Sequence, residues 1–508
     1  MSSLSSGNGS NADCIVVGAG PAGSTAATLI ALQGHRVLLI EKSDGPAHKI
    51  GESLLPSTVH GICPLLGVEK EIAEAGFILK RGGTFRWGKR QEPWTFDFAA
   101  SQKMAGPTST AFQVERIVFD KILLDNAERR GVQVRRGCRV SAPVYDGERV
   151  VGLEFVNESG NTETWRAPYT IDASGYQSTL SRRVGERIYS KYFQNIAVFG
   201  YYRNGKRLPS PNSGNIFCAA FEDGWFWYIP LRSDLTSVGV VLDKSRAVIN
   251  SDLAQTLFGY VDKCRPIKDL LAEAERVTDG IYGEVRARQD YSYTSTRFWA
   301  PGIVCIGDAA CFVDPVFSSG VHLATYSALL AARSVNTRLR GELDDEASFG
   351  EFESRYRHEY ANFYDFLLAF YDLDQDLSSY FWEAKKITHS AETEEQAFIN
   401  LVGGVGEDGE ATFDTTSFFE ARKNLGQFLF EEGNGKLAPP KLGSKSDFYR
   451  KLTSEITQLQ IQAQLGGKRP IEKPLFPNGL VPSRDGFHWS RAAVAPPKPQ
   501  SAVVRGID

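Results

Sequence analysis

The first forty residues alternate apolar and polar stretches in an order typical of a strand, a helix and a second strand. Residues 14–17 predict a buried strand, residues 22–33 a helix and residues 36–40 another strand. Two such strands joined by a helix lie parallel in one sheet. A further strand at 303–306 and an alanine-rich helix at 319–338 indicate that the chain returns to this sheet. We therefore expect an α/β fold with a discontinuous first domain.

Other hydrophobic patterns predict a second, largely β part of the chain. Residues 132–171 alternate short strands with turns such as Asp146-Gly147, which indicates a small meander within the first domain. Residues 195–242 are rich in aromatic and β-branched side chains, as substrate-binding sheets are. Between residues 349 and 370, aromatic residues recur every three or four positions. This spacing predicts a long helix whose aromatic face packs in the core and also covers part of a substrate groove.

These patterns divide the chain into five expected parts. They are a disordered leader (1–11), a discontinuous cofactor domain (12–80, 105–185 and 300–345), a β-rich substrate domain (81–104 and 186–299), a C-terminal helical region (346–465) and a proline-rich irregular tail (466–508).

Composition and charge exclude several classes of protein. The 508 residues carry 57 basic and 61 acidic side chains, and no basic stripe indicates nucleic-acid binding. The seven cysteines contain no C-x-x-C pair, so we expect no metal site and a reducing, cytoplasmic location. No run of about 18 apolar residues occurs, which argues against a membrane span.

A glycine-rich turn lies between the first strand and the first helix. Gly18, Gly20 and Gly23 form G-x-G-x-x-G, and Glu41 follows at the end of the second strand. Such glycines permit a tight turn and close approach of a pyrophosphate to the helix N-terminus, while the acidic residue accepts ribose hydroxyls. The context predicts a dinucleotide site.

Two further segments resemble the flavin monooxygenase-like family, which favours FAD over NAD. Gln113-Val114-Glu115-Arg116 precedes a helix, as does that family's flavin-contacting arginine, and Gly307-Asp308 follows a strand, as does its ribityl-binding pair. Asp172-Ala173-Ser174-Gly175 also resembles a family signature, although a strand-exit turn explains it as well. The resemblance implies a Rossmann-like FAD domain of the p-hydroxybenzoate hydroxylase type. The expected FAD contacts are Gly18, Gly20, Ala22, Gly23, Glu41, Lys42, Ser53, Arg116, Asp308 and Gly320.

Three local motifs resemble flavin-dependent halogenases, most closely those that act on phenols bound to carrier proteins. Residues 225–230 fit W-x-W-x-I-P. Phe312, Pro315, Ser318 and Gly320 fit F-x-x-P-x-x-S-x-G, and Lys80 lies where the family places its catalytic lysine. The resemblance implies a catalytic role for Lys80 and a barrier formed by Trp225, Trp227, Ile229 and Pro230.

Each motif also has a physical role of its own. Paired indoles are rigid blocks that would keep an organic substrate from the flavin, although packing in a β core also accounts for single tryptophans. The N-terminus of the helix at Ser319 is a natural anion site, so we expect chloride near Pro315, Ser318, Ser319 and Gly320. A desolvated Lys80 would carry the halogen as a haloamine or donate a hydrogen bond to hypohalous acid. Spacing leaves Lys49 and Lys89 as competitors.

One departure from the family pattern bears on the substrate. Tryptophan halogenases carry a glutamate directly before the motif's serine, where this chain has Phe317. We therefore expect a substrate activated by its own electron-donating group, such as a phenol or pyrrole.

The resemblance as a whole implies an FADH₂-dependent halogenase of natural-product biosynthesis. It would use a separate flavin reductase, O₂ and chloride or bromide, a flavin hydroperoxide and hypohalous acid, and a tyrosyl group on a carrier protein. The alternatives are an NAD(P)H-dependent aromatic hydroxylase and a catalytically silent flavin-binding protein.

Overall fold

The computed structural model describes residues 10–404 and 474–491, apart from residues 46, 90–91, 102–103, 105–107, 373–376, 389–392, 477–478 and 484. Its centre is a six-stranded sheet in the order β19-β20-β12-β2-β3-β8. The strands are β2 (Cys14–Val17), β3 (Val37–Ile40), β8 (Gln133–Arg135), β12 (Tyr169–Asp172), β19 (Trp299–Ala300) and β20 (Ile303–Cys305). All pair in parallel except β19 with β20. The expected return of the chain to its first sheet is therefore confirmed.

Helix α1 (Pro21–Ala31) packs on strands β2 and β3, and α7 (Ser319–Arg340) packs against α1. The strands β2, β3 and β12 are buried along their whole length, as parallel strands covered by helices are. Their apolar runs in the sequence follow from this burial. The remaining helices of the first half are α2 (Cys63–Leu66), α3 (Glu69–Glu74) and α4 (Arg116–Arg129), with a π-helical segment at Ser57–Ile62.

A four-stranded sheet, whose strand β10 packs on β12 of the six-stranded sheet, contains the expected meander. Its order is β1-β11-β10-β9, from β1 (Ser10–Asn11), β9 (Arg139–Asp146), β10 (Arg149–Val156) and β11 (Thr162–Arg166). Gly147 turns the chain between β9 and β10 with φ near +59°, a backbone conformation that glycine adopts without strain. Strand β1 corrects one expectation, because the last two residues of the predicted leader pair with β11; residues 1–9 lie outside the described part.

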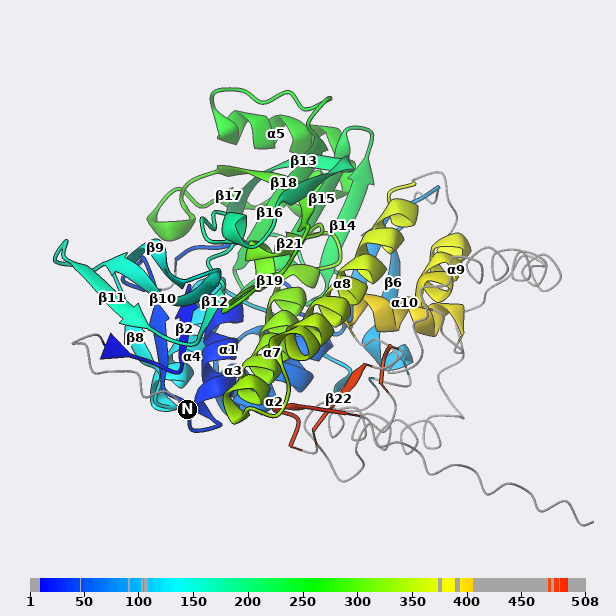
Figure 1. Ribbon diagram of the computed structural model, residues 1–508. Coiled ribbons are helices and arrows are strands. Elements are labelled where there is room, and N and C mark those ends of the chain that lie inside the picture. Colours follow the sequence, from blue (N-terminus) through cyan, green and yellow to red (C-terminus); the bar gives the residue numbers. More distant parts are fainter. Residues whose placement is uncertain are drawn as a thin grey trace, which may run out of the picture.

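A nine-stranded sheet forms the second layer of the molecule (Figure 1). Its main order is β21-β18-β13-β16-β15-β14-β5-β6, and β17 pairs with β13. The strands are β5 (Gly82–Arg86), β6 (Trp94–Asp97), β13 (Arg187–Arg203), β14 (Ile216–Phe221), β15 (Gly224–Pro230), β16 (Leu235–Asp243), β17 (Glu275–Arg276), β18 (Arg286–Ser295) and β21 (Cys311–Phe312). One face carries a separate core with α5 (Leu253–Lys263) and α6 (Arg265–Leu270), and the other faces the cofactor domain.

The aromatic periodicity of the C-terminal half corresponds to α8 (Asp345–Phe370), the long yellow-green helix in Figure 1. Its residues Phe349, Phe352, Phe363 and Phe370 are buried, which confirms the expected core-facing stripe. Helices α9 (Leu377–Thr388) and α10 (Glu394–Val402) follow and pack against each other. A short hairpin of β4 (Ile78–Lys80) and β7 (Ala111–Gln113) lies earlier in the chain. The rest of the predicted helical region, residues 405–465, lies outside the described part.

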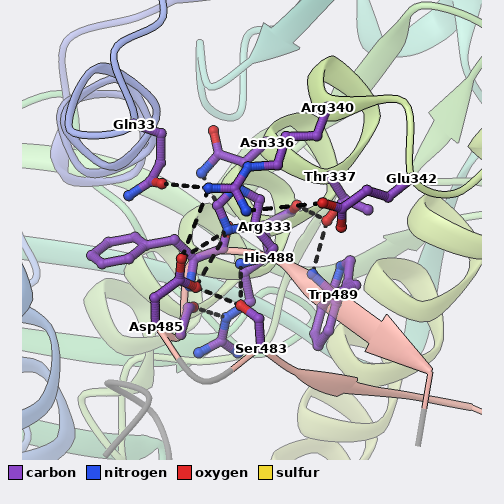
Figure 2. Close-up of polar contacts among 12 residues, drawn as sticks. Gln33, Arg333, Asn336, Thr337, Arg340, Glu342, Ser483, Asp485, His488 and Trp489 are labelled. Atoms are coloured by element: carbon purple, nitrogen blue, oxygen red, sulfur yellow. Dashed lines mark hydrogen bonds and ion pairs between the residues drawn. The ribbon is translucent and has the colours of Figure 1, made fainter.

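The proline-rich tail is not irregular throughout, which corrects the sequence prediction. A hairpin of β22 (Leu480–Pro482) and β23 (Trp489–Arg491) packs on α7 (Figure 2). Buried Trp489 donates its indole N–H to Ser334 at 2.9 Å, and its backbone N–H donates to Thr337 at 2.8 Å. Arg333 donates to the carbonyl of Gly486 at 2.6 Å. The prediction of an irregular tail from its proline content was wrong for this segment, because a buried tryptophan and the side chains of α7 hold it in place.

Among the described residues, no helix is long and apolar enough to cross a membrane. The same residues contain no group of three or more His, Cys, Asp or Glu side chains suited to a metal ion. All seven cysteines are buried free thiols.

Candidate functional site

A cavity of about 600 Å³ extends from the glycine-rich turn to the nine-stranded sheet. One end is lined by Gly18, Gly20 and Glu41, and the other by Trp225 and Trp227. Its volume falls within the range of small-molecule and cofactor sites. The cavity brings together most of the residues that the sequence assigned to FAD.

Each of the three motif glycines is required for a different structural reason. Gly18 has φ near +100°, and a Cβ there would lie 2.5 Å from the carbonyl oxygen of Ala173. A Cβ on Gly23 would lie 1.8 Å from the carbonyl oxygen of Gly18, so Gly23 allows the helix to approach the strand. At Gly20, nothing lies within 4 Å of an added Cβ. A side chain at Gly20 would therefore extend into the cavity without contacting other protein atoms.

Charged residues beside the turn are held in place by the backbone and by ion pairs. Glu41 accepts from the N–H of Ala19 at 2.7 Å and of Ser43 at 3.0 Å, and Lys42 also lines the cavity. Arg116 pairs with Asp120 at 2.8 and 3.0 Å. This pair is buried at the cavity wall and is not a surface ion pair.

The cavity residues fit an FAD molecule. Ser53 has a buried hydroxyl without a partner in the structure, and it lines the cavity, so a ligand atom there would satisfy it. Asp308 also lines the cavity, and burial raises the pKa of its carboxyl. The open space at Gly20 suits a pyrophosphate at the N-terminus of α1. Bound there, FAD supplies redox chemistry with oxygen that no side chain provides.

The paired tryptophans lie on β15 and close the far end of the cavity. Their ring centroids are 6.3 Å apart. Trp227 donates to Ser237 at 3.1 Å, and Gly239 opposite it leaves room for the ring, because a Cβ at Gly239 would lie 2.2 Å from the indole. Ile229 lines the same wall, whereas Pro230 ends β15 buried and outside the cavity lining.

The segment before α7 brings a helix N-terminus to the cavity. Pro315, Ser318 and Gly320 line it, whereas Ser319 is buried and does not. Ser318 is the N-cap residue of the helix and has φ near +60°, a left-handed conformation that is uncommon for non-glycine residues. Phe317 stacks on Phe366 of α8 with ring centroids 5.0 Å apart. This geometry is suited to a small anion at the N–H groups of the first turn.

Lys80 is 2% exposed and does not line the cavity. Its Nζ donates to the carbonyl oxygen of Leu54 at 2.9 Å and lies 5.5 Å from the ring of Phe98. Burial lowers the pKa of the amine to about 7. Leu54 follows the cavity residue Ser53, so the amine lies just beyond the cavity wall. The competitors differ, because Lys89 is exposed and Lys49 lines the cavity itself.

The lowered pKa of Lys80 predicts a pH effect on stability. Because the folded pKa is about 7 and an unfolded lysine titrates near 10.4, the unfolded chain binds one more proton between these values. The contribution of Lys80 to the free energy of unfolding therefore rises with pH. We expect the wild-type value minus that of Lys80→Met, measured by urea denaturation, to increase by about 1.2 kcal/mol per pH unit from pH 7 to 9, because the folded amine is still half protonated at pH 7. A constant difference would contradict the low pKa.

Two buried carboxyl groups at the site escaped the sequence analysis. Glu52 lines the cavity and accepts from Tyr201 at 2.7 Å, and burial raises its pKa to about 7. Asp314 precedes the cavity residue Pro315, and burial also raises its pKa to about 7. Their positions next to Ser53 and Pro315 in the sequence were the available signal, but burial of a charged residue is not visible in a single sequence.

Comparisons with known proteins identify the family of this chain. The tryptophan halogenase family matches residues 13–106 and 100–428. A tryptophan 2-halogenase from Chondromyces crocatus is 34% identical over 441 residues, which cover 84% of this chain and 81% of that protein. The structure is similar to the myxobacterial chondrochloren halogenase, with 46% identity, a TM-score of 0.73 and coverage of 95% of this chain and 100% of the other. A flavin-dependent brominase structure gives 27% identity, a TM-score of 0.70 and coverage of 82% and 100%.

The fold is therefore the flavin monooxygenase-like Rossmann fold expected from the sequence, and the site is that of a flavoenzyme. The chain belongs to the tryptophan halogenase family of flavin-dependent halogenases. It is an oxidoreductase that uses FAD, O₂ and halide, and the hydroxylase and silent-protein alternatives are not favoured.

Proposed function

We propose that this halogenase chlorinates or brominates a phenolic group, such as a tyrosyl thioester, carried by an acyl carrier protein. A separate flavin reductase would supply FADH₂, which the residues of the cavity would hold and which would provide the chemistry that converts O₂ and halide to hypohalous acid. Lys80 then delivers the electrophilic halogen. The observation that carries the proposal is the buried amine of Lys80, whose pKa is lowered to about 7 just outside the cavity wall.

The surroundings of Lys80 support a neutral aromatic substrate. The amine lies over the ring of Phe98. The ring centroid of Phe96 lies 5.6 Å from that of Phe98 and 5.3 Å from that of Phe398 on α10. A free amino acid needs partners for its carboxylate and ammonium groups, and this aromatic shell offers none. A tyrosyl thioester has no carboxylate, so it needs a partner for only one of these two charged groups. The shell therefore favours an acyl group over a free amino acid.

The N-terminus of α7 supports the halide role. Ser318 and Gly320 line the cavity at a helix end, and unpaired backbone N–H groups with the helix dipole favour an anion. Pro315 has no N–H and narrows the same loop, while Ser319 contributes through the first helical turn. Trp225 and Trp227 line the same cavity, and we infer that their rings stand between it and Lys80 and would exclude an arene from the cofactor.

The substrate assignment predicts a rate difference. With reduced FAD, O₂ and chloride, tyrosyl thioester on a carrier protein should be halogenated at least about 100-fold faster than free tyrosine at equal concentration, because binding energy from the arm is available only to the tethered form. Product is measured by mass spectrometry of the carrier and of the free amino acid. Equal rates, or turnover of free tyrosine alone, would refute the carrier assignment.

A second substrate has specific support. The Chondromyces crocatus relative is called a tryptophan 2-halogenase, and carbon 2 of an indole, like a phenol ring, is electron-rich without help from a glutamate at the position of Phe317. Free and carrier-bound tryptophan therefore belong in the same assay. Faster halogenation of either tryptophan form would replace the phenol with an indole as the substrate.

A further inference from the structure

A chain of hydrogen bonds links the indole barrier to the loop before α7. Trp225 donates its indole N–H to the hydroxyl of Tyr371 at 2.8 Å. Tyr371, directly after α8, donates this hydroxyl to Asp314 at 2.8 Å. The other carboxyl oxygen of Asp314 accepts from the backbone N–H of Val316 at 2.9 Å. Strand β15, the end of α8 and the predicted halide loop are thus joined through one tyrosine.

The two barrier tryptophans are held in different ways. Trp227 is held within the sheet, because both Ser237 and Gly239 belong to the neighbouring strand β16. The indole N–H of Trp225 instead bonds outside the sheet, to Tyr371. Its ring centroid lies 5.9 Å from that of Trp87 and 6.3 Å from that of Trp227. The position of Trp225 therefore depends on the residue that follows α8.

Asp314 determines the direction of the hydrogen bonds, that is, which group donates and which accepts. Its side chain is 2% exposed, and Asn195 lies 3.5 Å from the oxygen that Tyr371 contacts. Because a buried carboxylate needs donors, the hydroxyl of Tyr371 is directed to Asp314, and its oxygen accepts from Trp225. Burial raises the pKa of Asp314 to about 7. The ionised carboxyl group is therefore destabilised by desolvation at this position.

We propose that Tyr371, oriented by Asp314, is a positioning residue that holds Trp225 across the route between the cofactor cavity and Lys80. The inference rests on the proposed function, in which hypohalous acid travels along this route. With Trp225 fixed, the oxidant is retained until it reaches Lys80. With Trp225 released, part of the oxidant escapes to solvent before the arene is halogenated.

The test is the partition of the oxidant in Tyr371→Phe. Halogenated arene and halogenated monochlorodimedone, added as a scavenger with catalase present, are measured in the same reaction. The ratio of scavenged halogen to product should rise about tenfold, the effect of one lost hydrogen bond on a conformational equilibrium. Asp314→Asn should change the ratio in the same direction. An unchanged ratio in Tyr371→Phe would overturn the proposal.

Tyr364→Phe is the matched control. Tyr364 lies in the last two turns of α8, and its hydroxyl bonds to Ser190 at 2.8 Å. Its ring centroid lies 5.5 Å from that of Phe193, and the ring centroid of Tyr371 lies 5.2 Å from the same phenylalanine. Tyr364→Phe should keep the wild-type ratio. An equal rise in this variant would overturn the specific role of Tyr371, because general loosening of α8 would explain both results.

A second measurement does not depend on the loaded enzyme. In cofactor-free protein labelled with 5-fluorotryptophan, the ¹⁹F resonance that disappears in Trp225→Phe should shift in Tyr371→Phe and stay unchanged in Tyr364→Phe. No shift in Tyr371→Phe would overturn the proposal. Failure of the proposed substrate is distinguishable, since wild-type enzyme would then halogenate the scavenger but not the phenolic arene, while the resonance still shifts in Tyr371→Phe.

Discussion

Lys80→Met is expected to lower the yield of halogenated product by at least about 100-fold, the usual effect of removing a positioned acid, base or nucleophile. FAD binding and flavin reoxidation should stay at wild-type values, because Lys80 does not line the cavity. Methionine is an unbranched apolar side chain that fits the place of the lysine stem between Leu54 and Phe98. Product is measured by mass spectrometry and FAD by its absorbance.

Two lysines serve as controls for this variant. Lys89→Met changes an exposed residue and should leave product yield unchanged. Lys49→Met changes a cavity residue and should weaken FAD binding without abolishing halogenation by saturated enzyme. Lys80→Arg separates the two chemical roles, because an arginine still donates hydrogen bonds but cannot form a neutral haloamine. Near-normal product from Lys80→Met would remove this residue from the mechanism.

The first sheet was predictable because its signals are local. The run Cys14–Val17 is buried on both faces, and a strand buried in this way has no polar alternation. Gly18 and Gly23 are required by backbone contacts within the same turn. The hairpin at β22 and β23 was missed because its order comes from Ser334 and Thr337, more than 140 residues away along the chain.

The site residues also differ in whether their signal in the sequence is local or depends on contacts with distant residues. Motifs such as W-x-W-x-I-P identified Trp225 and Trp227, because their spacing on one strand places both on the same face. Tyr371 carries no motif, and it reaches Trp225 only through the packing of α8. The pKa of Lys80 likewise depends on burial beneath residues distant in the sequence. A single sequence therefore indicates the residue types of the site but not which of them are desolvated or linked.

Gly20→Val is expected to abolish FAD retention in a protein that still folds. A Cβ at Gly20 meets no protein atom within 4 Å, and the residue lines the cavity. The branched side chain would therefore occupy ligand space at the N-terminus of α1, where the pyrophosphate must approach the backbone. We expect the Kd for FAD to rise by at least about 100-fold, since both the pyrophosphate contacts and the helix-terminus interaction are blocked. Retention is measured by fluorescence titration.

Two glycine variants separate binding from folding. Gly23→Val places a Cβ 1.8 Å from the carbonyl oxygen of Gly18 and should lower the free energy of unfolding severely, because the helix cannot move off the strand without losing its buried contacts. Gly259→Val changes a helical position of α5 where an added Cβ also meets nothing within 4 Å, and it should retain FAD. A yellow, folded Gly20→Val protein with the wild-type Kd would show that the pyrophosphate does not approach Gly20, and the orientation of FAD in the cavity would have to be reversed.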